Sequence, residues 1–99
     1  MKYREEFNES DIETLCQDER FLVCMHSYIN SRVSIIEAMR RYMGEVNKYP
    51  CGLSFNACWQ MAATIGKRIE EGKISISTKI IDKYPELLAP QTEIPKTRR

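Results

Sequence analysis

The stretch Phe21–Val46 decides the fold, and it reads FLVCMHSYINSRVSIIEAMRRYMGEV. Apolar side chains recur along it in steps of three or four residues, at Leu22, Met25, Ile29, Val33, Ile36, Met39, Met43 and Val46. Side chains with this spacing stack along one face of an α-helix. No proline interrupts the stretch, and its only glycine lies near the end. We therefore predict one long helix over about 19–47, whose quoted part would span about 39 Å.

A second helix is expected after the strongest break in the chain, Pro50-Cys51-Gly52. Proline cannot continue a helix, and the residue before it is biased away from helical geometry. Ser54 is a good N-cap for a helix over about 54–71, and Gly72 fits as its C-terminal cap. The sequence therefore predicts a mostly α fold, a small domain built on a long antiparallel helical hairpin.

Shorter elements are expected on both sides of this hairpin. Ser10 and Glu13 have the spacing of a capping box, which predicts a first helix over about 11–17. Residues 73–78 are expected to form an extended connector, with Ser77 or Thr78 capping a final helix over about 79–84. Prolines then recur every five residues, which predicts a helical domain over 1–84 and an extended, proline-containing basic tail over 85–99.

The composition is that of an ordinary globular domain. The chain has 99 residues, of which 42% are hydrophobic and 29% charged. The net charge of +1 gives no overall attraction to nucleic acid or to anionic membranes. The charge is unevenly distributed, because residues 1–20 carry three basic and seven acidic side chains. We therefore expect an acidic N-terminal arm on a mildly basic body.

The expected location is cytoplasmic, with no membrane partner. The N-terminal sequence MKYREEFNES lacks the apolar core of a secretory signal, and no uncharged apolar run approaches the roughly 18 residues of a membrane span. In a reducing compartment the four cysteines are expected to be thiols.

Metal and thiol chemistry depend on those cysteines, which are Cys16, Cys24, Cys51 and Cys58. No Cys-x-x-Cys motif is present, and Cys24 and His26 would lie about 200° apart around a helix. Any Cys/His mechanism must use His26, the only histidine, and the thiol of Cys51 or Cys58 would have to approach it from the other arm of the hairpin. We therefore expect no catalytic, metal or cofactor site, and keep a thiol- or zinc-dependent enzyme as the third alternative.

Nucleic-acid binding is the second alternative. Two basic pairs, Arg40-Arg41 and Lys67-Arg68, would lie on neighbouring antiparallel helices and could converge into one patch. A helix-turn-helix needs two short helices, which a continuous helix over 19–47 does not provide. The two basic pairs nevertheless keep a small helical DNA-binding transcriptional regulator open as an alternative.

Protein binding is the leading hypothesis. A second helix cannot cover the whole apolar face, so the edge near Met39 and Met43 is expected to meet another chain. The tail has the composition of segments that dock into grooves, and its X-Pro bonds make a prolyl isomerase a conceivable partner. The predicted partner-binding residues are Met39, Arg40, Met43, Pro85, Pro90, Pro95, Lys96, Arg98 and Arg99.

In its size, its helical body over 18–72 and its tail PELLAPQTEIPKTRR, the chain resembles the anti-RecBCD accessory proteins of temperate phages such as bacteriophage P22. The resemblance implies binding to the RecC subunit of the RecBCD recombination nuclease, altered processing of DNA ends, and no active site. We therefore expect a non-enzymatic modulator of a host protein complex in the cytoplasm of a bacterial host.

Overall fold

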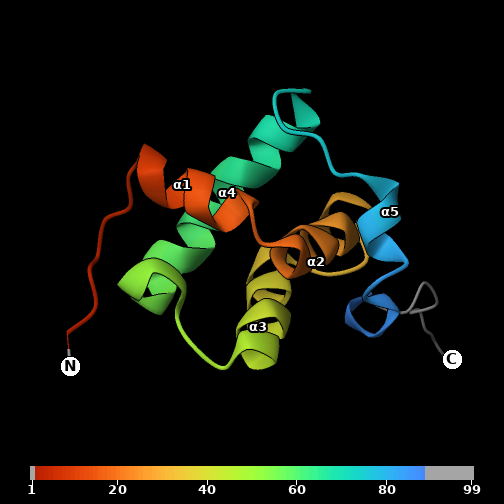
Figure 1. The fold of residues 1–99 in the computed structure, drawn as a ribbon. Coiled ribbons are helices and arrows are strands. Elements are labelled where there is room, and N and C mark those ends of the chain that lie inside the picture. The colour runs from red at the N-terminus through yellow and green to blue at the C-terminus, as the bar shows by residue number, and fades with distance from the viewer. Residues whose placement is uncertain (1, 89–99) are drawn as a thin grey trace, which may run out of the picture.

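The computed structural model describes residues 2–88, and this part of the chain is helical (Figure 1). Its elements are α1 (Glu9–Cys16), α2 (Glu19–Ile29), α3 (Ile35–Val46), the short 3-10 helix η1 (Pro50–Gly52), α4 (Phe55–Glu70), α5 (Thr78–Ile81) and a second 3-10 helix, η2 (Pro85–Leu87). Within residues 2–88 the only extended pairing is an isolated bridge between Arg4 and Leu53. The predicted mostly α fold is therefore confirmed.

The predicted single helix over 19–47 is wrong, because the chain leaves helical geometry between α2 and α3. Ser31 has a left-handed backbone with φ 61°. Its N–H donates to the Tyr28 carbonyl at 2.9 Å, and the Arg32 N–H donates to the Ser27 carbonyl at 2.9 Å. These two bonds form a Schellman motif, which satisfies the last carbonyl groups of α2 and ends the helix.

A new helix cap follows the break directly. The Ser34 hydroxyl accepts the backbone N–H of Glu37 at 3.1 Å, so Ser34 is the N-cap of α3. The three-to-four spacing of apolar residues continues across the break, and this continuity conceals it in the sequence. Without one long helix, the predicted antiparallel hairpin is not confirmed.

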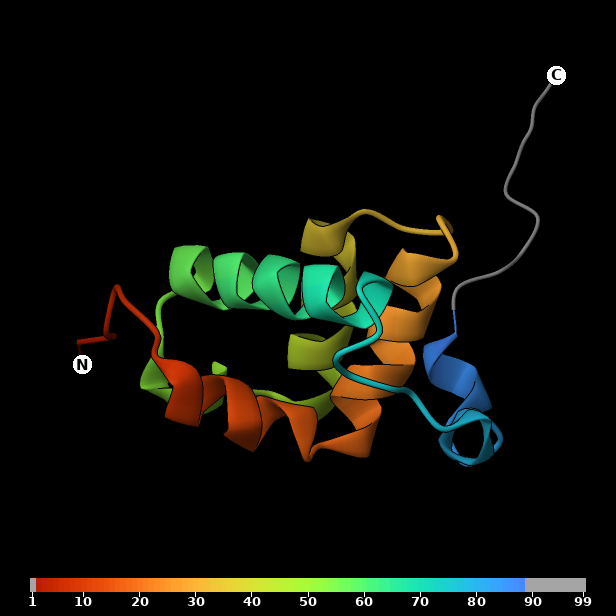
Figure 2. The same ribbon diagram turned by 90° about the horizontal axis from the view of Figure 1, so that it is seen from above.

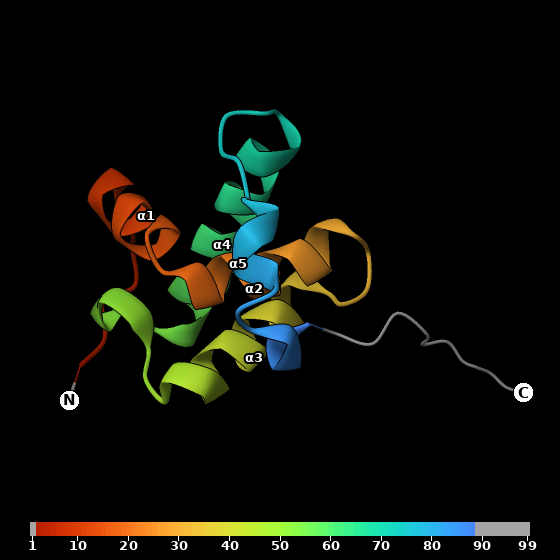
Figure 3. The same ribbon diagram turned by 45° about the vertical axis from the view of Figure 1, so that its right-hand side comes forward.

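The central element is α2, which contacts α1, α3, α4, α5 and η2. Figure 2 shows α2 crossing α4 near the C-terminal end of α4, and Figure 3 shows α5 lying over α2. The consecutive residues Val23, Cys24 and Met25 are all completely buried. Burial on successive positions means that α2 is enclosed nearly all round, whereas a single apolar stripe was expected. Of the predicted stripe, Met25 and Met39 are fully buried and the other members are partly buried.

The second predicted helix is confirmed as α4. Ser54 caps it by accepting the Ala57 N–H at 3.2 Å, and Gly72 follows its end with φ 80°. Close packing on α2 requires a glycine at position 66, because a Cβ there would lie 2.9 Å from a ring carbon of Tyr28.

The N-terminal arm is held by Arg4. Its backbone N–H donates to the Gly52 carbonyl at 2.9 Å, and its carbonyl accepts the Ser54 N–H at 2.8 Å. Its guanidinium donates to Asp11 Oδ1 at 2.9 Å and to the Cys51 carbonyl at 2.8 Å. One side chain therefore fixes the arm to both α1 and η1.

The start of α1 differs from the expected capping box at Ser10 and Glu13. Asn8 is the N-cap: its side chain accepts the Asp11 N–H at 2.9 Å, and the Asp11 carboxylate accepts the Asn8 N–H at 2.9 Å. The reciprocal pairing is thus present two residues earlier in the chain.

The last described elements extend the body past the predicted boundary at residue 84. Ser77 caps α5 as expected, accepting the Lys79 N–H at 3.2 Å. Pro85 begins η2, and Leu87 is buried in the core at 6% exposure. The remainder of the predicted tail, with Pro90, Pro95, Lys96, Arg98 and Arg99, lies outside the described residues.

Candidate binding surface

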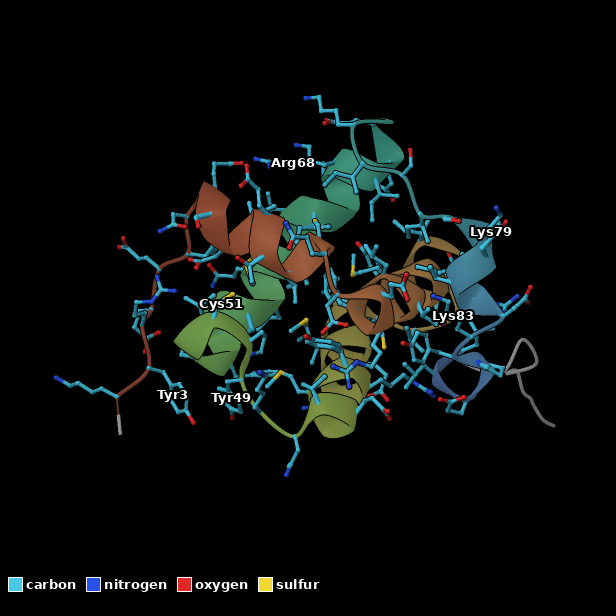
Figure 4. The ribbon with its side chains drawn as sticks, viewed as in Figure 1. Tyr3, Tyr49, Cys51, Arg68, Lys79 and Lys83 are labelled. Carbon is cyan, nitrogen blue, oxygen red and sulfur yellow. The ribbon has the colours of Figure 1, made fainter. Side chains whose placement is uncertain are left out.

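Two exposed tyrosines stack on each other where the N-terminal arm meets the turn before η1. The ring centroids of Tyr3 and Tyr49 are 4.7 Å apart, with 28° between the ring planes (Figure 4). The two side chains are 42% and 39% exposed, and they are the large hydrophobic residues left exposed within residues 2–88. Exposed apolar surface of this kind often marks an interaction site, so the surface around Tyr3 and Tyr49 is a candidate interface.

Two adjoining hollows surround the pair. One, of about 470 Å³, is lined by Tyr3, Met43, Asn47, Lys48, Tyr49 and Gly52. The other, of about 420 Å³, is lined by Arg40, Met43, Gly44, Tyr49 and Phe55. Because both include Met43 and Tyr49, they form one continuous surface. We call these nine residues together the tyrosine surface.

Helix geometry and one left-handed residue build this surface. Arg40, Met43, Gly44 and Asn47 follow one another at three- and four-residue spacing, so they share a face of α3. Asn47 ends the helix with φ 57°, and its N–H donates to the Met43 carbonyl at 2.7 Å. The chain then turns so that Tyr49 lies beside the arm that Arg4 holds.

The tyrosine surface carries positive charge without a compensating carboxylate. Among residues 2–88, its lining includes Arg40 and Lys48 and no aspartate or glutamate. Neither cation forms an ion pair with another residue of the described part. In contrast, the next arginine, Arg41, pairs with Glu37 at 3.5 Å on the adjoining helix face.

The sequence-predicted partner residues are divided by the structure. Arg40 and Met43 lie on the tyrosine surface, and their role in binding a partner stays a prediction. Met39 does not: it is completely buried in the core, so its assignment to an interface is corrected. Pro85 is exposed on η2, which lies on the side of the molecule away from the N-terminal arm (Figure 1).

Sequence reasoning missed Tyr3 and Tyr49. Tyr49 precedes Pro50, and an aromatic residue next to a turn is a signal that could have marked it as exposed. Nothing local to Tyr3 indicates its neighbour, because the stacking depends on the long-range contacts of Arg4.

The thiols are placed for packing. Cys24 and Cys58 are completely buried. Burial raises the pKa of Cys24 to about 12 and that of Cys58 to about 11, so both stay protonated at neutral pH. All four cysteines are free thiols. In the described part of the chain, no group of three or more His, Cys, Asp or Glu residues could hold a metal ion.

His26 contacts its own helix. Its Nε2 lies 3.2 Å from the side-chain nitrogen of Asn30, and burial together with the charge of Arg32 lowers the pKa of the imidazole. This geometry favours a neutral ring that accepts a hydrogen bond from the amide at Nε2.

The predicted basic patch is partly neutralised. Arg68 donates to both carboxylate oxygens of Glu9, at 2.9 and 2.7 Å, and Arg41 pairs with Glu37. Two of the four cations proposed for phosphate contact therefore already have carboxylate partners.

Two other hollows each contain a charged group with a partner inside the hollow, and Lys48 also lines the smaller one. A hollow of about 530 Å³ between α1 and the end of α4 includes the Glu9–Arg68 ion pair. A smaller one, of about 150 Å³, includes Asp18 and Tyr42, whose hydroxyl donates to that carboxylate at 2.6 Å.

Comparisons with protein-family models, with curated proteins and with solved structures find no match for this chain. Among the helices of residues 2–88, none has the length and apolar character needed to cross a membrane.

Proposed function

We propose that this protein is a non-enzymatic binding protein that modulates a host protein complex, and that the tyrosine surface contacts that complex. The observation that carries the proposal is the exposed stack of Tyr3 on Tyr49 beside Met43. Tyrosine, methionine and arginine are the residue types enriched at protein interfaces. Within one surface the chain presents all three.

The arrangement suits a small group of dominant contacts. Stacking holds each ring against the other, so little side-chain freedom is lost when a partner covers them. The hollows on either side of Met43 can receive side chains of the partner. Tyrosine is enriched among interface hot spots, whose truncation to alanine weakens binding by about 2 kcal/mol or more.

The resemblance to anti-RecBCD accessory proteins makes the RecC subunit of RecBCD the first complex to test. On this proposal the protein acts in the cytoplasm of a bacterial host and alters DNA-end processing by contact alone. A prolyl isomerase stays a prediction for the proline tail, whose residues 89–99 lie outside the described part.

The proposal is tested by affinity purification from host cells, with the bound partner quantified, and by binding to purified RecBCD. Three proteins are compared: the wild type, Tyr49→Ala, and Lys79→Ala as a control on the opposite side (Figure 4). The expected result is a stoichiometric partner with the wild type and the control, and about tenfold or more weaker binding with Tyr49→Ala. Equal binding by all three would remove the tyrosine surface, and no stoichiometric partner would overturn the proposed function.

A further inference from the structure

We propose that the occupant of the tyrosine surface is a short acidic segment of a partner protein, in which an apolar anchor residue is flanked by aspartate or glutamate. This inference rests on the proposed function and adds the chemistry of the partner. Three features of the surface carry it: its apolar centre, its unpaired cations and its acidic surroundings.

The apolar centre lies between the two hollows. Met43 and Tyr49 line both, and Phe55 closes one of them from the start of α4. Met43 and Phe55 are partly buried against the core, so each keeps some surface available. An unbranched methionine adapts to the shape of an inserted side chain. The centre therefore suits one apolar anchor.

The cations flank this centre. Arg40 lines the hollow that includes Phe55, and Lys48 lines the one that includes Tyr3. Because no carboxylate of residues 2–88 lines either hollow, the two charges are available to pair with carboxylates of a partner. An arginine can bind a carboxylate through two parallel hydrogen bonds, which adds orientation as well as affinity.

The surroundings favour a protein segment over a nucleic acid. The exposed acidic side chains of Glu5 and Glu6 lie on the same arm as Tyr3. A DNA duplex carries about one negative charge per 1.7 Å of its axis, so its phosphates would face these carboxylates as well as the cations. A short acidic segment places its carboxylates at Arg40 and Lys48 alone.

The test is a selection of random short peptides displayed on phage, performed on the full-length protein. The same selection is performed on Tyr49→Ala and on the double variant Arg40→Glu/Lys48→Glu. Lys67→Glu/Lys79→Glu is the matched control, since it reverses two exposed lysines that form no ion pair in the described part. Circular dichroism confirms that each variant is folded before selection.

The expected peptides combine an apolar residue with flanking aspartate or glutamate. Their binding falls about tenfold or more with Tyr49→Ala and with Arg40→Glu/Lys48→Glu, and less than about threefold with the control. Peptides that need Tyr49 but show no acidic preference would overturn this inference and leave the proposed function standing. If no selected peptide depended on Tyr49, the proposed function itself would be overturned.

Two further measurements test whether a nucleic acid or a second copy of this chain occupies the tyrosine surface instead. Fluorescence anisotropy with a labelled oligo-deoxythymidine tests single-stranded nucleic acid, and light scattering at rising protein concentration tests a second copy of this chain. The inference expects weak oligonucleotide binding and a monomeric mass. It is overturned by an oligonucleotide that binds more tightly than the peptides and displaces them, or by a dimer that Tyr49→Ala dissociates.

Discussion

The ring of Tyr3 stacks on the ring of Tyr49 because Arg4, the next residue along the chain, is tied to α1 and to η1. Arg4 exchanges backbone hydrogen bonds with Gly52 and Ser54, while its guanidinium donates to Asp11. The tyrosine surface therefore combines eight residues from α3, the turn after it, η1 and the start of α4 with Tyr3 from the docked arm. Any change that releases the arm should remove Tyr3 from the surface.

Replacing Arg4 with alanine is expected to release the arm. The Ser54 amide, which donates to the Arg4 carbonyl at 2.8 Å, should then exchange its hydrogen faster. Hydrogen exchange measured by NMR checks this, with Lys2→Ala as the control on the same arm. Unchanged protection of Ser54 in Arg4→Ala would show that the arm is held by other contacts.

The ion pair between Arg4 and Asp11 predicts that the stability of the fold depends on pH. The hydrogen bond from Arg4 holds the pKa of Asp11 below its ordinary value of 3.8. Because the pKa is lowered in the folded state, the stabilisation is present above about pH 4 and is lost as the pH falls through the lowered value. A carboxyl titration followed by NMR should give Asp11 a higher pKa in Arg4→Ala than in the wild type.

Tyr42 and Asp18 form a second long-range tie, between α3 and the start of α2. The Tyr42 hydroxyl donates to Asp18 at 2.6 Å, and Asp18 also accepts the Arg20 N–H as the N-cap of α2. Tyr42→Phe should lower the free energy of unfolding by about 1.5–3 kcal/mol, because it removes a hydrogen bond to a charged group. Urea denaturation measures this, and Tyr28→Phe is the control, expected within about 0.5 kcal/mol of the wild type.

Both acid and base should weaken the hydrogen bond between Tyr42 and Asp18. Burial raises the pKa of Asp18, but hydrogen bonds from Tyr42 and Arg20 outweigh it and leave the pKa lowered, so this contribution is lost as acid protonates Asp18. Burial and then Asp18 raise the pKa of Tyr42 above its ordinary value of 10.0. That contribution is fully present below pH 10 and is lost as the pH rises through the raised value. Equal pH dependence of unfolding in the wild type and in Tyr42→Phe would contradict this account.

The break between α2 and α3 is tested at Ser31. In the left-handed conformation a glycine avoids the strain of a Cβ, so Ser31→Gly should be more stable than Ser31→Ala by about 1 kcal/mol. In a continuous helix the order would be reversed by a similar amount. Thermal unfolding of the two variants decides between the two structures.

Thiol reactivity tests the enzyme alternative. Burial raises the pKa of each cysteine above its ordinary value of 9.0. We therefore expect all four thiols to react with a disulfide reagent at neutral pH more slowly than free cysteine, with Cys24 and Cys58 slowest. A thiol that reacts faster than free cysteine would point to an activated nucleophile and would favour a thiol enzyme.

The features that the sequence predicted correctly depend on local signals, such as the residues that cap a helix. The bounds of α4 follow from the serine before it and the glycine after it, and both caps form as expected. The break after α2 was missed because the apolar spacing continues across it, although Ser34 and Glu37 have the spacing of a cap and its third helical residue. A stricter search for caps within the long stretch would have divided it.

The candidate surface was less predictable, because part of it is non-local. Helical periodicity placed Met43 on the edge predicted to meet another chain, and Met43 lies on the tyrosine surface together with Arg40. The same periodicity placed Met39 there, but Met39 is completely buried in the core, which the pattern of one helix does not show. Tyr3 joins the surface only through the contacts that Arg4 makes far along the chain.

The most direct test of the central claim is a two-dimensional ¹H–¹⁵N NMR titration of the full chain with an acidic peptide from the selection. The four glycines serve as probes, because Gly44 and Gly52 line the tyrosine surface whereas Gly66 and Gly72 lie in and after the C-terminal part of α4. The account predicts shifted amide signals for Gly44 and Gly52 with those of Gly66 and Gly72 unchanged. Shifts confined to Gly66 and Gly72 would place the binding surface elsewhere and contradict it.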